Sequence, residues 1–217
     1  RNTDPVLTDV SVTPTTGAVG DILTCAATAT DDDGDTLSTD YAWSTGATGA
    51  TYTIQSTDDP GDTLTCTATV TDTDGGTATG TASATVTNTD PVVIATSVSP
   101  SSGAVGDTLT CSASATDADG DTPTQAYAWT NGSTTVGSSN TYTIQTTDDP
   151  GDTLTCTATA SDAFGGSDTG TATASVTNTE PVMGTVSISP SSATNDDTLT
   201  CSASATDVDG GTPTLSY

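Results

Sequence analysis

Apolar and hydroxyl side chains alternate along most of this chain. In the segment 23–30, Leu23 and Cys25 share one parity with two alanines, while threonines dominate the other parity, and the segments 64–70 and 82–86 repeat this arrangement. A period of two is typical of half-buried strands, and no segment has the period of a helix. Pro-Gly, Asp-Gly and Gly-Gly turns separate the segments at intervals of about ten residues. The pattern therefore predicts an all-β sandwich.

The same pattern of segments returns at a period of about ninety residues. Asn2-Thr-Asp-Pro-Val recurs at Asn88 and, with glutamate in place of aspartate, at Asn178. The stretch from Tyr52 to Cys66 recurs almost unchanged from Tyr142 to Cys156. We therefore predict three repeats, at residues 1–87, 88–177 and 178–217, the last being the N-terminal part of a truncated third repeat.

Each of the first two repeats has two cysteines with one tryptophan between them. The pairs are Cys25 with Cys66 and Cys111 with Cys156, each on the inward parity of its strand, and the tryptophans between them are Trp43 and Trp129. A Cys–Trp–Cys order over about seven strands is typical of a sandwich whose two sheets are joined by a disulfide beneath a core indole. Buried free thiols are the alternative. Disulfides would indicate an oxidising compartment outside the cytosol.

Two motifs resemble known extracellular repeats. From Cys111 to Trp129 the chain reads Thr-Asp-Ala-Asp-Gly-Asp-Thr and then Tyr-Ala-Trp, which is similar to the polycystic-kidney-disease (PKD) repeat of bacterial extracellular proteins. The segment from Asp149 to Cys156 resembles the turn before strand F of immunoglobulin domains, with Leu154 in place of the corner tyrosine, so we expect no tyrosine-corner hydrogen bond. The resemblance implies tandem immunoglobulin-like seven-strand β-sandwiches with one disulfide per domain. It also implies functions in extracellular spacing, in adhesion or beside a secreted hydrolase.

The charge of the chain is almost entirely negative. There are 28 acidic residues and one basic residue, no histidine, and a formal net charge of −27. Nothing in the chain could neutralise nucleic-acid phosphates, and no apolar segment reaches the ~20 residues that cross a bilayer. A high net charge with few large aliphatic residues is also typical of disorder, but the regular alternation argues against a disordered chain.

Many of the carboxylates are predicted to gather at the ends of the sandwiches. In a seven-strand sandwich, the start of the first strand, the B–C loop and the F–G loop share one end. Calcium takes six to eight oxygen ligands, and an Asp-x-Asp-Gly-Asp turn presents several of them close together. The candidate calcium ligands in the B–C loops are Asp31, Asp33, Asp35, Asp117, Asp119, Asp121, Asp207 and Asp209. The alternative is that these residues simply form solvated turns that keep the protein soluble.

The functional prediction follows from what the chain contains and lacks. Without histidine or lysine, and with its aspartates in loops that we expect to be wet, it offers no general base, so we predict no enzyme. We predict a structural segment of a long extracellular filament, stalk or cell-surface adhesin, stiffened by disulfides and calcium. Its expected partners are neighbouring copies of the same repeat or chain and ligands of a host surface or matrix, with no membrane insertion. The alternative is a ligand- or carbohydrate-binding accessory module of a larger secreted protein, for which exposed Phe164 is the one candidate aromatic platform.

Overall fold

The computed structural model describes residues 2–217, and in this part of the chain every regular element is a strand. No helix in these residues could therefore span a membrane. The chain forms two compact units. The first contains residues 2–92 and the loops 116–124 and 161–168, and the second contains the remaining segments.

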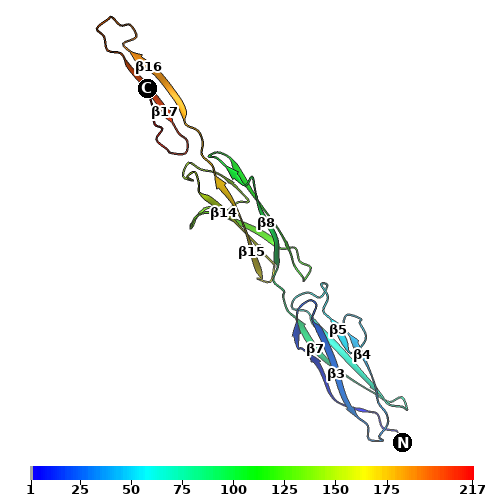
Figure 1. Cartoon of the computed structure of the whole chain (residues 1–217). Coiled ribbons are helices and arrows are strands. Elements are labelled where there is room, and N and C mark those ends of the chain that lie inside the picture. The colour runs from blue at the N-terminus through cyan, green and yellow to red at the C-terminus, as the bar shows by residue number, and fades with distance from the viewer. Residues whose placement is uncertain (1) are drawn as a thin grey trace. The chain divides into compact units, whose positions relative to one another are not determined.

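The first unit contains a sandwich of two sheets (Figure 1). One sheet has three antiparallel strands in the order β1-β3-β5, with β1 at Val6–Thr13, β3 at Ile22–Thr30 and β5 at Thr51–Thr53. The other has four strands in the order β2-β7-β6-β4, with β2 at Thr16–Gly17, β7 at Thr77–Val86, β6 at Thr63–Thr71 and β4 at Ser38–Trp43. The short β2 runs parallel to β7. This is the seven-strand immunoglobulin-like arrangement that the sequence predicts.

The apolar parity of each strand points between the two sheets. Leu23 of β3 and Leu64 of β6 are buried in one cluster that also contains Trp43. A disulfide joins Cys25 to Cys66 and so links β3 of one sheet to β6 of the other. Because threonine takes the alternate positions, burying this one face of each strand is enough to build the core.

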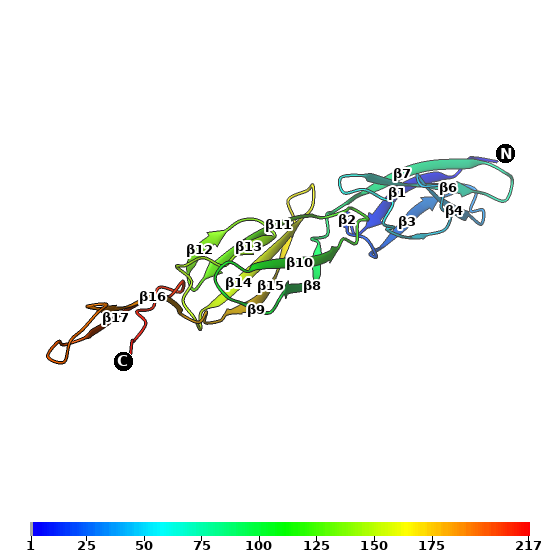
Figure 2. The same cartoon turned by 90° about the horizontal axis from the view of Figure 1, so that it is seen from above.

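The second unit contains a sandwich with one strand more (Figure 2). Its three-stranded sheet has the order β13-β10-β8, with β13 at Thr141–Thr143, β10 at Thr108–Thr116 and β8 at Val92–Ser99. Its five-stranded sheet has the order β12-β11-β14-β15-β9, with β12 at Thr134–Gly137, β11 at Thr124–Asn131, β14 at Thr153–Ser161, β15 at Ser167–Val176 and β9 at Ser102–Gly103. Cys111 and Cys156 form its disulfide, and Trp129 is fully buried in its core.

The additional strand β12 comes from a longer connection after the tryptophan strand. The disulfide-bonded cysteines are 45 residues apart in this sandwich and 41 in the first. The extra length lets Thr134–Gly137 turn back and pair with Trp129–Asn131 of β11. The sequence pattern predicts seven strands here, and the eighth is the one departure from that count.

The second unit also contains a pair of strands that repeats the start of the sandwiches. Strand β16 at Val182–Ser189 pairs antiparallel with β17 at Thr200–Thr206. Ile188 lies opposite Cys201, just as Val12 lies opposite Cys25 in the first sandwich. The pair is thus built in the register of β1 and β3, while the division of the chain into three repeats stays a prediction.

Candidate metal centre

The B–C loop of the first sandwich, residues 31–37 between β3 and β4, brings three carboxylates together. One oxygen atom from each of Asp31, Asp33 and Asp35 lies within 4.8 Å of the other two. Asp31 and Asp35 are half-buried and Asp33 is exposed. Within residues 2–217, no other group of three histidine, cysteine, aspartate or glutamate side chains converges this closely.

Hydrogen bonds to Asp31 shape this loop. Its Oδ1 accepts the backbone N–H of Asp33 at 2.8 Å and that of Asp35 at 3.3 Å. Gly34 between them has a φ of 79°, a conformation that favours glycine. The second oxygen of Asp31, Oδ2, is buried and accepts no hydrogen bond. A buried carboxylate oxygen without a donor is costly, and a bound cation would remove that cost.

Two neighbouring segments hold the other two carboxylates. The backbone N–H and the hydroxyl of Thr3 donate to Asp33 Oδ2 at 2.7 and 2.9 Å. The hydroxyl of Thr73, in the F–G turn at 72–76, donates to Asp35 Oδ1 at 3.1 Å. Asp33 and Asp35 are therefore each fixed through one carboxylate oxygen, which leaves the other oxygen able to coordinate a cation. The donor set fits calcium, which prefers carboxylate, carbonyl and water oxygens.

The B–C loop of the second sandwich, residues 117–123, repeats the turn but not the cluster. The N–H of Asp119 donates to Asp117 Oδ1 at 2.9 Å, and Thr89 donates to Asp119 through its N–H and its hydroxyl at 2.7 and 3.1 Å. Asp117 Oδ2 is buried without a partner, like its counterpart in the first loop. Asp121, however, is exposed, and Ala163 stands where the first sandwich has a threonine. With no hydroxyl to hold Asp121, the third carboxylate does not join the other two.

The loop after β17 follows the same plan with two carboxylates. The N–H of Asp209 donates to Asp207 Oδ1 at 3.1 Å. The N–H of Thr179 donates to Asp209 Oδ2, and the other oxygen of Asp209 is buried without a hydrogen bond. All three predicted loops therefore contain a buried carboxylate oxygen that lacks a donor, but three carboxylates converge in the first loop alone.

In each of the two sandwiches, the F–G turn contains a further aspartate beside the B–C loop. Asp72 Oδ1 accepts the N–H groups of Asp74 and Gly76 at 2.9 and 2.8 Å, and Asp72 Oδ2 accepts the side-chain amide of Asn2 at 3.1 Å. Burial acts to raise the pKa of Asp72, but these hydrogen bonds outweigh it and hold the pKa below its ordinary value. The carboxylate thus stays ionised and ties the start of β1 to the end of β6.

Asp162 has the same role in the second sandwich. The side-chain amide of Asn88 lowers its pKa most, at a distance of 2.9 Å, and the N–H groups of Phe164 and Gly166 add to the effect. Because the folded pKa lies below the unfolded one, Asp162 stabilises the fold above its unfolded pKa. That contribution is lost as the pH falls through the folded pKa.

A glycine ends each F–G turn because two carboxylates approach it. A Cβ on Gly76 would lie 2.4 Å from Asp72 Oδ2 and 2.6 Å from Asp4 Oδ1. The sequence analysis placed the Asn-Thr-Asp-Pro segment and the F–G turn at the same end of the sandwich but did not predict this contact between them. The signal was available in the sequence, since that segment and an aspartate four residues before a glycine occur together in both complete repeats.

The opposite ends of the sandwiches correct the expectation that the aspartates lie in solvated loops. In the loops before strand F, one aspartate of each sandwich is buried. Asp148 is 1% exposed, and its oxygens accept the hydroxyl of Tyr142 at 2.7 Å, the N–H of Gln145 at 2.9 Å and the amide of Asn131 at 3.0 Å. Burial, followed by the hydrogen bond to Asp148, raises the pKa of Tyr142. These donors satisfy both buried oxygens of the Asp148 carboxyl group, which is why an aspartate is tolerated in the core.

The first sandwich contains the same pair, with the hydroxyl of Tyr52 donating to buried Asp58 at 2.8 Å. Leu64 and Leu154 occupy the place of the corner tyrosine and are buried. A tyrosine from strand E, β5 or β13, therefore fixes the loop before strand F, where immunoglobulin domains use a tyrosine of strand F itself.

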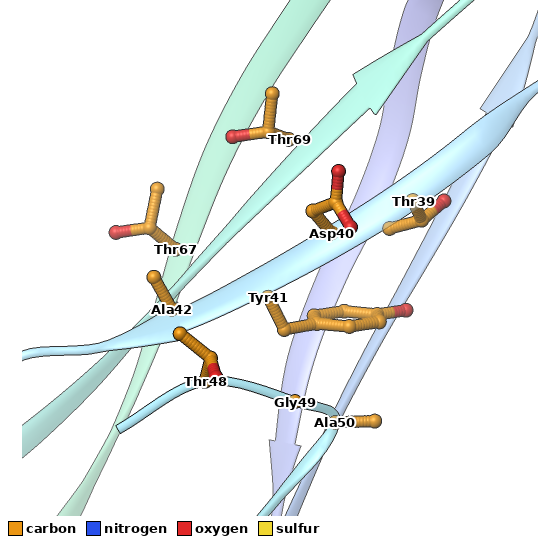
Figure 3. A pocket seen from close by; sticks show the side chains of 9 residues that line it. All are labelled: Thr39, Asp40, Tyr41, Ala42, Thr48, Gly49, Ala50, Thr67 and Thr69. Carbon is orange, nitrogen blue, oxygen red and sulfur yellow. The ribbon is translucent and has the colours of Figure 1, made fainter. Parts of the chain in front are cut away.

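A hollow of about 620 Å³ lies along β4 of the first sandwich (Figure 3). Figure 3 shows the ring of Tyr41 beside Gly49 and Ala50 on one side of the β4 ribbon, with Asp40, Thr67 and Thr69 on the other. The strand pattern predicts that Tyr41 points inward, and its side chain is half-buried against the core while still bordering this hollow. Phe164, the aromatic platform expected from the sequence, is 51% exposed in the F–G turn.

Comparisons with known proteins assign the chain to no family. No protein-family model matches the chain, and no curated protein matches it. The four N-terminal immunoglobulin domains of Dscam1 isoform 6.9 match 82% of this chain and 46% of their own at 11% identity, with a TM-score of 0.34. The insect immune protein hemolin matches 80% of this chain and 46% of its own at 15% identity and a TM-score of 0.43. Drosophila N-cadherin EC1-4 matches 82% of this chain and 50% of its own, at 10% identity and with a TM-score of 0.41. The chain thus spans about half the length of these proteins.

Proposed function

We propose that this chain is a structural segment of an extracellular filament, stalk or surface adhesin. The observation that supports this most is repetition, since two disulfide-bonded sandwiches are followed by a strand pair in the register of their first sheet. Without histidine or lysine, the chain lacks two of the residue types that most often act as general bases. The proposed role is mechanical, with neighbouring copies of the repeat or chain and ligands of a host surface or matrix as partners.

Single-molecule extension tests the mechanical role. In the oxidised chain, the residues between Cys25 and Cys66 cannot extend when the first sandwich unfolds, because the disulfide bridges a separation of 41 residues. At ~3.4 Å per residue, reduction should lengthen the unfolding step of the first sandwich by roughly 140 Å. Steps of equal length with and without reductant, or unfolding without a resolvable force, would argue against a load-bearing segment.

We further propose that calcium binds the B–C loop of the first sandwich. Asp31, Asp33 and Asp35 would supply one oxygen each, with Asp31 Oδ2 as the oxygen that most needs a cation. Neutralising three close carboxylates removes their mutual repulsion and fixes the loop to the start of β1. By the same reasoning the second loop, whose third carboxylate is not held, would bind calcium more weakly.

Thermal melting tests this calcium site. Calcium at about 100 times its Kd should stabilise the sandwich by ~2.7 kcal/mol, which raises the melting temperature by roughly 11–22 °C relative to EDTA. Asp31→Asn should remove most of that increase. Asp9→Asn removes one exposed acid outside the loop and should leave the increase intact. Equal melting temperatures in calcium and EDTA would exclude the site without affecting the fold.

One observation favours a second function, that of a carbohydrate-binding accessory module. The hollow beside β4 combines the Tyr41 ring with the Asp40 carboxylate and threonine hydroxyls, and a ring with a few polar groups suits a neutral sugar. A glycan array should then show saturable binding that Tyr41→Ala abolishes. Tyr127→Ala is the matched change in the second sandwich and should leave binding unaltered. An array without specific binding would leave the structural role as the sole candidate.

A further inference from the structure

The sequence contains a single Asn-Gly pair, and it lies in the second sandwich. Asn131 ends β11 and pairs with Thr134 of β12, and Gly132 follows it in the turn between the two strands. Gly132 has a φ of 56° and open space where a Cβ would lie. Because glycine has no side chain, its backbone nitrogen meets little obstruction when it attacks the amide carbon of a preceding asparagine. The pair is therefore chemically reactive wherever its backbone can move freely.

In the folded sandwich, however, two carboxyl groups hold the side-chain amide of Asn131. Its Nδ2 donates to Asp148 Oδ1 at 3.0 Å and to Asp152 Oδ2 at 2.6 Å, so both of its hydrogens are in use. Within the described residues this amide is the one donor to Asp148 Oδ1, because the other hydrogen bonds of Asp148 go to Oδ2. The amide carbon cannot turn toward the Gly132 nitrogen without breaking both bonds.

The first sandwich shows that the fold does not require an amide at this position. The matching residue is Thr45, two residues after Trp43, as Asn131 is two residues after its tryptophan. Asp58 keeps its tyrosine hydrogen bond there and is 6% exposed. A threonine is therefore a replacement that this fold accepts and that lacks the reactive amide.

We propose that Asn131 is a deamidation site, which the folded second sandwich protects and which unfolding exposes. In the reaction the backbone nitrogen of Gly132 bonds to Cγ of Asn131. The Cγ–Nδ2 bond breaks, and Nδ2 leaves as ammonia with the proton that the Gly132 nitrogen gives up. Water then opens the cyclic imide at either of its carbonyl carbons, which leaves aspartate or isoaspartate at this position.

Both products fit the folded sandwich poorly. Neither has an amide hydrogen to donate, so Asp148 Oδ1 loses its donor in a residue that is 1% exposed. Isoaspartate also adds a methylene group to the main chain, which shifts the pairing of Asn131 with Thr134. Because ammonia is lost, a sandwich that stays unfolded long enough to react refolds into a permanently less stable form.

Peptide mapping by mass spectrometry, after incubation of the oxidised full chain in buffer or in urea, tests the protection. Asn131 should deamidate in urea, and in buffer at least about 100-fold more slowly, because the reaction follows the small population of opened molecules. Asn140 is exposed and precedes Thr141, whose branched side chain obstructs the attack. It should stay intact in both solutions.

Two variants test whether the carboxyl groups provide the protection. Asp152→Ala removes one of the two acceptors and should speed the reaction of the folded chain. Asp149→Ala removes an exposed acid nearby and should leave the rate unchanged. Equal rates for these two variants would overturn the proposal, as would equal rates for Asn131 in buffer and in urea, or an Asn131 that stays intact in both.

Calorimetry tests the consequence for refolding without waiting for the reaction. Asn131→Asp reproduces one product and should lower the melting temperature of the second sandwich by at least about 4 °C. Asn131→Thr keeps a hydroxyl donor and adds no charge, so it should lower that temperature clearly less. The transition of the first sandwich is the internal control and should not move. Equal melting temperatures for the two variants would contradict the proposed effect of deamidation.

Discussion

Replacing Cys25 and Cys66 by serine should strongly destabilise the first sandwich. The disulfide links the two sheets across a separation of 41 residues, and closing a loop of that length contributes about 4 kcal/mol in the chain-entropy model. For a domain of this size that corresponds to a fall in melting temperature of roughly 15–30 °C. Differential scanning calorimetry of the double variant measures it directly.

The chain supplies its own control for this prediction. Cys201→Ser removes an exposed thiol that forms no disulfide, so the transitions of both sandwiches should remain where they are. The Cys111–Cys156 sandwich should likewise melt unchanged in the double variant. A loss of less than about 1 kcal/mol would mean that packing alone holds the two sheets together and that the disulfide adds little to their stability.

Asp148→Ala should have the second large effect, although it removes a charge from a very acidic protein. The substitution leaves the hydroxyl of buried Tyr142 and the N–H of Gln145 without their acceptor. The hydroxyl of Tyr142 is buried and the N–H of Gln145 is partly buried. Buried donors without partners cost about 1–3 kcal/mol each, so we expect a loss of about 3 kcal/mol in the second sandwich. Urea denaturation followed by the fluorescence of Trp129 would measure it.

Asp149→Ala is the matched control, because it removes the same charge from the next residue, which is exposed. It should change the free energy of unfolding by less than about 0.5 kcal/mol. If the two variants behaved alike, Asp148 would have to be solvated, and the buried network with Tyr142 would be wrong.

The strand pattern was sufficient to predict the fold, because period-two alternation determines which face of each strand is buried. Leu23, Cys25 and Trp43 all lie on the predicted inward parity and are buried. The alternation could not predict β12, since Thr134–Gly137 differs from an ordinary loop only by the length that lets it fold back on β11.

The candidate site was harder to predict, because it depends on contacts between segments far apart in the chain. Spacing alone treats the loops of the first two repeats as equivalent. The structure separates them through one residue, because Thr73 holds Asp35 while Ala163 cannot hold Asp121. The burial of Asp58 and Asp148 was missed for a similar reason. Each of these aspartates accepts a hydrogen bond from the hydroxyl of a tyrosine six residues earlier, on the neighbouring strand.

Disulfide mapping of the unreduced protein is the sharpest test of two sheets joined by a sulfur bridge within each sandwich. Trypsin-like proteases have one site at most, but a protease that cleaves beside aspartate would separate all five cysteines. We expect two linked peptide pairs, Cys25 with Cys66 and Cys111 with Cys156, and a free thiol at Cys201. Free thiols at Cys25 and Cys66, or a bond between Cys25 and Cys111, would refute this arrangement, because neither is compatible with two sheets joined within each sandwich.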